Sequence, residues 1–245
     1  MALLIKKYAI GFCLAILFAG CASKQIKTSV NISADEFSHL SWDNKINVFE
    51  RGENYIVPYE IYELAFRESE AVVVIAALDS IPEKSSEDYK SILYPLLRYS
   101  NPVVRWKSCQ KISASPRIED LPFLILNLRD RDWMVKECTV KSIRQYREEK
   151  NNKDYFFNIV ALLFEANTQV LREVYKTLKW YDDARAFPFM YKRSFHVDNT
   201  SVLIVILQEL VEYNNDEVRQ RLWHLSRNSP SYFVREEAKK LLATM

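Results

Sequence analysis

Apolar and small residues recur at a fixed spacing along most of the chain. A valine is followed four residues later by a small or β-branched residue, and eight residues later by Ile or Leu. At about 100° per residue these positions fall on one stripe of a helix, so each copy predicts a helix with one buried face. Six copies occur: Val73/Ala77/Ile81, Val104/Ser108/Ile112, Val135/Thr139/Ile143, Val170/Val174/Leu178, Val202/Ile206/Leu210 and Val234/Ala238/Leu242.

The six valines are 31, 31, 35, 32 and 32 residues apart. A near-constant period in this range is typical of a solenoid of helix pairs. Each patterned stretch is therefore interpreted as the second helix of a hairpin. Alternation at period two is nowhere sustained, so strands are not expected. The first helices are predicted at 58–67, 88–99, 119–128, 154–164, 184–192 and 217–227.

Local sequence signals support the predicted starts of the second helices. Asn101 followed by Pro102 offers a capping side chain and a proline at the first helical position. Prolines inside two first helices, Pro95 and Pro188, are expected to kink or interrupt them. The equivalent capping places of later units are occupied by Asp132, Thr168, Thr200 and Ser231.

A short helical cap, residues 34–53, is predicted before the repeat domain of residues 54–245. Ser33 and Glu36 have the spacing of a capping box, so a helix is expected to begin at Ala34. Further along, three residues share a helical face and a glycine suits the helix end: Trp42, Ile46, Phe49 and Gly52.

The repeated unit resembles the HEAT repeat, particularly the short type first named for phycobilisome bilin lyases. The family's Val-Arg at the start of the second helix is matched by Val104-Arg105, Val135-Lys136 and Val234-Arg235, and its acidic turn by Asp130 and Asp132. The fourth and fifth units depart from it, with Leu171 and Leu203 after the valine. The resemblance implies an all-α, right-handed α-solenoid of about six helical hairpins. Some relatives are bilin lyases, but a fold does not confer that activity.

The second helices of such a solenoid line its concave surface, where positions +2, +6 and +9 from the valine point away from the buried stripe. In the third and fourth units these positions carry five basic residues and one acid, and the second unit adds a tryptophan at +2. One hypothesis is a groove for an acidic partner segment. The alternatives are a solvated face whose cations pair with neighbouring acids, and a tryptophan that packs against the preceding turn. The residues are Trp106, Glu137, Lys141, Arg144, Arg172, Lys176 and Lys179.

The fifth unit is apolar on all sides, from Val202 to Leu207 and on to Val211. A helix of this kind is expected to be buried on all sides by its neighbours. If it were exposed, it would mark a contact with a partner or a second copy.

The first 21 residues have the pattern of a secretory signal. Lys6 and Lys7 precede an apolar run of about 12 residues, too short to span a bilayer as a helix, which needs about 20. With its small residues before a cysteine, the segment resembles a bacterial lipoprotein signal peptide with its lipobox. The resemblance implies that residues 1–20 are removed, that Cys21 is lipidated, and that residues 21–33 form a polar tether. Because Ala22 and not aspartate follows the cysteine, it also implies an outer-membrane location facing the periplasm.

Composition removes several classes of function. Only three glycines occur, and Gly11 and Gly20 lie in the signal, so glycine-rich nucleotide-binding loops are excluded. The net charge of +2 falls to zero once Lys6 and Lys7 leave, so no global field favours nucleic acid. No histidine has metal-ligand spacing, and no cofactor is expected.

Two cysteines remain after processing, Cys109 and Cys138. Their positions on adjacent helices, +5 and +3, predict side chains that point apart, hence two buried free thiols. Three functions stay open: a lipid-anchored scaffold that binds another protein and is not an enzyme, a bilin-lyase-like enzyme or accessory, and a self-associating envelope component.

Overall fold

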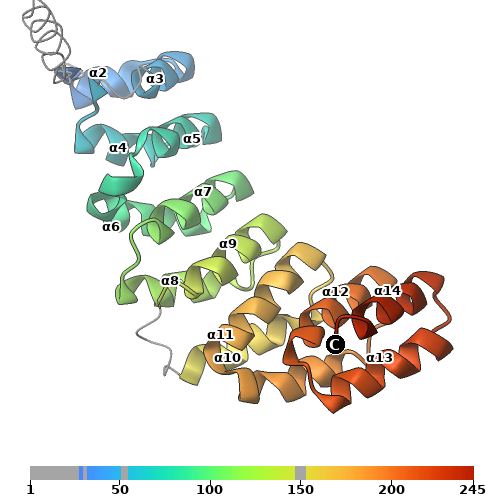
Figure 1. Cartoon of the computed structure of the whole chain (residues 1–245). Coiled ribbons are helices and arrows are strands. Elements are labelled where there is room, and N and C mark those ends of the chain that lie inside the picture. The colour runs from blue at the N-terminus through green and yellow to red at the C-terminus, as the bar shows by residue number, and fades with distance from the viewer. Residues whose placement is uncertain (1–27, 30–31, 51–54, 147–152) are drawn as a thin grey trace, which may run out of the picture.

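The computed structural model describes residues 28–29, 32–50, 55–146 and 153–245. Within these ranges the protein is all-α apart from one two-residue strand pair, and its helices pack sequentially as in a helical repeat. Successive hairpins stack along an arc, and the patterned helices line its inner, concave side (Figure 1). They are α5 (Ala71–Ser80), α7 (Pro102–Ser113), α9 (Trp133–Ile143), the first half of α11 (Thr168–Arg193), α12 (Thr200–Leu210) and α14 (Tyr232–Leu242).

The valine pattern forms the spine of the core, as predicted. All six valines, all six +4 residues and five of the +8 residues are buried. Leu242, in the last helix, is only partly buried. Each unit contributes three such residues, so a continuous apolar stripe runs from α5 to α14 and supplies the hydrophobic term that stabilises the stack.

Three of the first helices contain 3-10 turns, and that of the first unit is shorter than predicted. Pro95 interrupts the second unit, where α6 (Lys90–Leu93) lies between the 3-10 helices η1 (Glu83–Tyr89) and η2 (Tyr94–Arg98). Proline lacks the N–H that an α-helix needs, and a 3-10 turn accommodates it. The others are α4 (Tyr59–Ala65), η3 (Ile118–Asp120) with α8 (Leu121–Asn127), α10 (Lys153–Val160) with η5 (Ala161–Phe164), and α13 (Asp216–Asn228), which η6 (Val211–Tyr213) precedes.

No break separates the fourth second helix from the fifth first helix. Helical hydrogen bonding continues from Thr168 to Arg193, so both predicted segments belong to α11. The chain still turns back within this segment, as predicted, because Arg193 Nε donates to the carbonyl of Leu163 at 2.9 Å, whereas the ends of a straight helix of this length would lie about 39 Å apart. Pro188 lies inside this helix without ending it. No glycine or second proline lies in this stretch, and a single proline can be accommodated when tertiary packing supports the helix on both sides.

Helix capping follows the predicted chemistry with a shift of one residue in two units. Ser33 and Glu36 form the capping box, and Asn101, Asp132 and Ser231 cap their helices. In the fourth and fifth units the caps are Asn167 and Asn199, one residue before the predicted threonines. Asparagine is the better cap, because its side-chain oxygen accepts readily from the first free N–H groups.

The N-terminal cap consists of two helices, α2 (Ala34–His39) and α3 (Trp42–Phe49). Phe49 is buried as expected, whereas Trp42 is exposed and Phe37 supplies the buried ring instead. Within the predicted tether, β1 (Thr28–Ser29) pairs in parallel with β2 (Tyr55–Ile56), so this part of it is attached to the domain. Gly52 lies outside the described residues.

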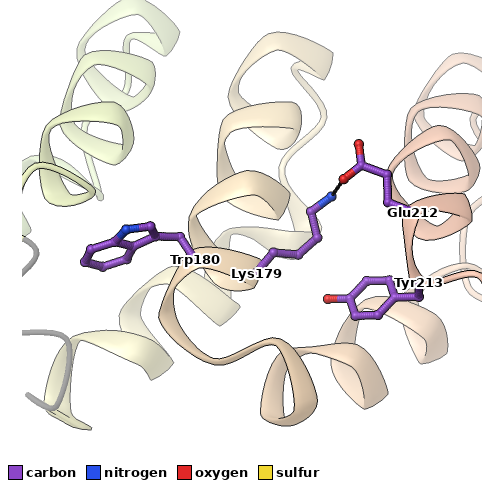
Figure 2. A pocket seen from close by; sticks show the side chains of 4 residues that line it. All are labelled: Lys179, Trp180, Glu212 and Tyr213. Atoms are coloured by element: carbon purple, nitrogen blue, oxygen red, sulfur yellow. Dashed lines mark hydrogen bonds and ion pairs between the residues drawn. The ribbon is translucent and has the colours of Figure 1, made fainter.

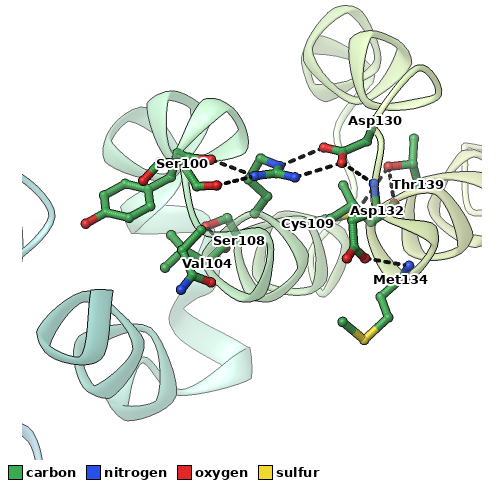
Figure 3. Close-up of polar contacts among 12 residues, drawn as sticks. Ser100, Val104, Ser108, Cys109, Asp130, Asp132, Met134 and Thr139 are labelled. Carbon is green, nitrogen blue, oxygen red and sulfur yellow. Dashed lines mark hydrogen bonds and ion pairs between the residues drawn. The ribbon is translucent and has the colours of Figure 1, made fainter. Parts of the chain in front are cut away.

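A recurrent polar contact links the turns between helices. The Arg105 guanidinium donates to the carbonyls of Tyr99 and Ser100 and binds both carboxylate oxygens of Asp130 in the next unit, at 2.7 and 2.8 Å (Figure 3). Tyr99 in turn donates through its hydroxyl to the equivalent carbonyls of Glu68 and Ser69. These contacts satisfy carbonyls that helix ends leave free, and they explain why a cation after the valine suits this stack.

A buried ion pair joins the second and third units. The Lys90 ammonium lies 2.7 Å from Asp120 Oδ2, and the two side chains are only 5% and 0% exposed. The Asp120 carboxylate also accepts from the hydroxyls of Tyr94 and Tyr146, at 2.6 and 2.9 Å, and from the backbone N–H of Arg117. Burial and the adjacent carboxylate raise the pKa of both tyrosines, which keeps them protonated as donors.

The apolar helix of the fifth unit is buried within the molecule, as predicted. Leu203, Val205 and Leu207 of α12 are all buried, although they lie outside the valine stripe. Helix α12 packs between α11 and α14, which cover its two sides. Its hydrophobicity therefore stabilises the stack, while Ile204 and Val211 of the run stay partly exposed.

Candidate functional site

The five basic residues predicted for the concave groove do lie on neighbouring helices. Lys141 is on α9 and Arg144 is at its C-terminal end, while Arg172, Lys176 and Lys179 are on the first half of α11. These two helices pack directly against each other. The structure thus brings together the cations that the sequence placed on one face.

Every one of these cations has a carboxylate partner. Arg144 is paired with Glu173 of the next unit, and Lys176 lies 3.4 Å from the same carboxylate. Lys141 binds Glu137 at 2.6 Å, one helical turn away. The predicted imbalance of five bases to one acid is therefore wrong for the surface as a whole, because it counted only three positions on each helix.

The missing acids come from the fifth unit as well. Glu209 of α12 lies 3.7 Å from Arg172 and 3.6 Å from Lys179, and Lys179 also pairs with Glu212. Arg172 donates a further hydrogen bond to Gln208 at 2.7 Å. Burial raises the pKa of Glu209, and the Lys179 ammonium acts in the opposite direction. The result is a ladder of ion pairs across three units.

The ladder has an inner and an outer part. Arg144 and Lys179 are mostly shielded and connect different helices. The side chains of Lys141, Arg172 and Lys176 are 48%, 42% and 49% exposed, and the partners of the two lysines lie on their own helices. Short-range pairs of this kind are worth about 0.3–0.5 kcal/mol, so a ligand can exchange with them at small cost.

An open pocket of about 390 Å³ adjoins the ladder where α11 meets η6. It is lined by Lys179, Trp180, Glu212 and Tyr213. Lys179 and Glu212 point toward each other above the Tyr213 ring, while Trp180 points away on the opposite side of α11 (Figure 2). A partly buried tyrosine ring beside an ion pair suits the binding of a polar chain segment.

Trp106, the aromatic predicted for the groove, packs partly buried against the core. The Lys107 ammonium lies 5.8 Å from the centroid of its ring. This agrees with the packing alternative, and part of the ring stays accessible. No group of three or more metal-ligating side chains gathers within the ranges that the structure describes.

No family model matches the chain, and no curated protein sequence matches it. Among solved structures, the chain is similar to an engineered protein determined by the Northeast Structural Genomics Consortium, at 15% identity and a TM-score of 0.44. That match covers 76% of this chain and 95% of the engineered protein.

The two cysteines are free and buried, as predicted, but the argument for it was wrong. Their side chains converge: the sulfurs of Cys109 and Cys138 lie 3.7 and 4.0 Å from the same hydroxyl, Ser142 Oγ. Two side chains that point in opposite directions meet in the space between two neighbouring helices when each lies on the side of its helix that faces the other helix. The Cys109 sulfur and burial together raise the pKa of Cys138, so its thiol stays protonated.

Cys21, the predicted lipidation site, lies outside the described residues, as does the whole signal segment of residues 1–20. Among the helices that the structure describes, none has the length and hydrophobicity to cross a bilayer.

Proposed function

We propose that the protein is a lipoprotein, anchored through Cys21, that acts as a protein-interaction scaffold in the cell envelope. Its binding surface is the concave face of the helical solenoid. The observation that carries the proposal is the outer part of the ion-pair ladder: the side chains of Lys141, Arg172 and Lys176 are far more exposed than the carboxylates that they pair with. Exposed cations held in register along a curved surface suit an extended acidic segment.

We further propose that the repeat is of the HEAT type and that the units form a right-handed superhelix. The support is the Val-Arg position, where Arg105 joins the turn of its own unit to Asp130 of the next. Lys136 pairs with Glu165 in the same relation one unit later, and Arg235 binds the carbonyls of Ser229 and Pro230. The cation after the valine makes the same kind of contact in several units, which gives the sequence resemblance a physical cause.

The proposed cellular location rests on the sequence of residues 1–21 alone. A basic start, a short apolar run and a cysteine after small residues favour export followed by acylation. More than one acyl chain at Cys21 would make anchoring stable. We place the mature protein at the outer membrane facing the periplasm, and we assign it no catalytic step.

Two experiments test this function. For the anchor, Cys21→Ser is expected to move the protein from the membrane to the soluble fraction, and mass spectrometry of the wild-type N-terminus is expected to detect acyl chains. An unmodified wild-type N-terminus would contradict the lipoprotein assignment.

For the groove, crosslinking in whole cells followed by purification is expected to capture a partner with an acidic segment. The double variant Lys141→Gln/Lys176→Gln is expected to lose that partner, because each lysine exchanges a weak local pair for the partner's carboxylates. Arg219→Gln/Lys239→Gln is a matched control, since both residues are exposed and form short-range pairs with Asp216 and Glu236. Equal capture by both variants would overturn the groove assignment.

A further inference from the structure

A second basic surface runs along the edge where each first helix ends. In four of the six units the residue three or four positions before the cap of the second helix is an arginine. The first three follow the 31-residue period of the chain, and all four side chains are exposed: Arg67, Arg98, Arg129 and Arg227. Because the units stack in one order, equivalent positions of successive hairpins follow one another along one edge of the stack.

In the fourth and fifth units the equivalent residues are Phe164 and Phe195, and the following unit supplies the guanidinium. Arg193 covers the Phe164 ring at 4.9 Å, and Arg221 covers the Phe195 ring at 4.0 Å. The same arginines donate to the carbonyls of Leu163 and Ser194. The rings stay 73% and 49% exposed. These two guanidiniums are partly buried and already hydrogen-bonded, so the fourth and fifth units mainly add exposed aromatic rings to the four exposed arginines of the edge.

The edge differs from the concave face in its charge balance. Within the described ranges, none of the six edge arginines has a carboxylate partner, whereas each of the five concave cations does. Asp130 and Glu165, which lie in the turns of this edge, are already bound to Arg105 and Lys136. Exposed edge acids without a pair are few, Glu70 and Asp198. The edge is thus a local positive stripe on a chain with a net charge of only +2.

We propose that this edge, defined by Arg67, Arg98, Arg129, Arg193, Arg221 and Arg227, docks on the anionic phosphate headgroups of a lipid bilayer. Guanidinium groups bind phosphate through planar pairs of N–H donors. Aromatic rings beside them suit the boundary between headgroups and acyl chains. The inference rests on the proposed anchor at Cys21, which would hold the edge close to a bilayer.

The test is co-sedimentation with vesicles of the chain from residue 21 onward carrying Cys21→Ser, so that no acyl chain contributes. The protein is expected to bind vesicles of phosphatidylcholine mixed with phosphatidylglycerol, and not phosphatidylcholine alone. Arg67→Gln/Arg98→Gln/Arg129→Gln is expected to lower the partition coefficient on the order of 100-fold, because each arginine near an anionic surface contributes about 1 kcal/mol. High salt is expected to weaken binding of the unaltered protein.

The matched control is Lys141→Gln/Arg172→Gln/Lys176→Gln, which removes the same charge from the concave face and is expected to bind these vesicles normally. Equal loss in both triple variants, no binding by the unaltered chain, or a preference for a single-stranded oligonucleotide over the vesicles would each overturn the inference. Circular dichroism checks that both variants stay helical. The vesicle assay uses neither the acyl chain nor a protein partner, so its failure would leave the anchor and capture results standing.

Discussion

The buried carboxylate of Asp120 offers the sharpest test of how this stack is held together. Replacing it with alanine leaves the Lys90 ammonium, only 5% exposed, without its counter-charge. It also removes the acceptor of the hydroxyls of Tyr94 and Tyr146. Removing one partner of a buried pair costs about 3–5 kcal/mol, because the remaining charge is desolvated without compensation. We expect Asp120→Ala to destabilise the domain by about 4 kcal/mol.

Thermal unfolding followed by far-UV circular dichroism measures the effect. For a domain of this size 1 kcal/mol shifts Tm by about 2–4 °C, so the expected loss is roughly 8–16 °C. The control is Asp79→Ala. The Asp79 side chain is 56% exposed, and its carboxylate pairs with Lys107. That change is expected to cost under about 1 kcal/mol.

A double variant separates desolvation from lost attraction. Asp120→Leu/Lys90→Met removes both charges and fills the site with apolar atoms, so it is expected to regain most of the stability that Asp120→Ala loses. The reasoning would be refuted if Asp120→Ala and Asp79→Ala lowered Tm equally, or if the double variant were less stable than Asp120→Ala.

Two further predictions concern acid stability and the thiols. Burial acts to raise the pKa of Asp130, but hydrogen bonds from Arg105 and from backbone N–H groups outweigh it and lower that pKa. The stability this gives is present at neutral pH and is lost as pH falls through the folded-state pKa. Arg105→Gln should therefore cost about 2 kcal/mol at pH 7 and less at low pH, where only its hydrogen bonds to the carbonyls of Tyr99 and Ser100 remain to be lost; an equal cost in urea unfolding at neutral and low pH would contradict this. Cys109 and Cys138 should react with a thiol reagent at pH 8 only after unfolding in urea, and fast labelling of the folded protein would show that their site opens.

Much of the fold follows from the sequence because it depends on short-range periodicity. The valine pattern predicted which helices line the spine, since a stripe at helical spacing can be buried on only one side. Asn101, Asp132 and Ser231 were predicted as caps and cap their helices, whereas the caps of the fourth and fifth units lie one residue before the predicted threonines. The first helices were less predictable, because Pro95 and Pro188 have different outcomes in similar sequence contexts. Packing from neighbouring units, which no local rule contains, decided between interruption and continuation.

The groove shows where reading one helix at a time fails. The sequence placed Lys141, Arg144 and the α11 cations on one face correctly. It missed Glu173 and Glu209, because these acids lie at other positions of the helical wheel and reach the cations across the gap between units. A side chain of five or six atoms spans neighbouring helices, so charge balance on a solenoid belongs to the surface and not to single helices.

By itself, the sequence determined the all-helical class, the period of the stack, the buried stripe and the burial of the fifth unit, because each depends on residues close together in the chain. Only the tertiary structure decided which cations are paired, how Cys109 and Cys138 meet over Ser142, and that guanidiniums from different positions form one edge. These features depend on the offset and rotation of one unit against the next, which are set by the summed packing of many side chains.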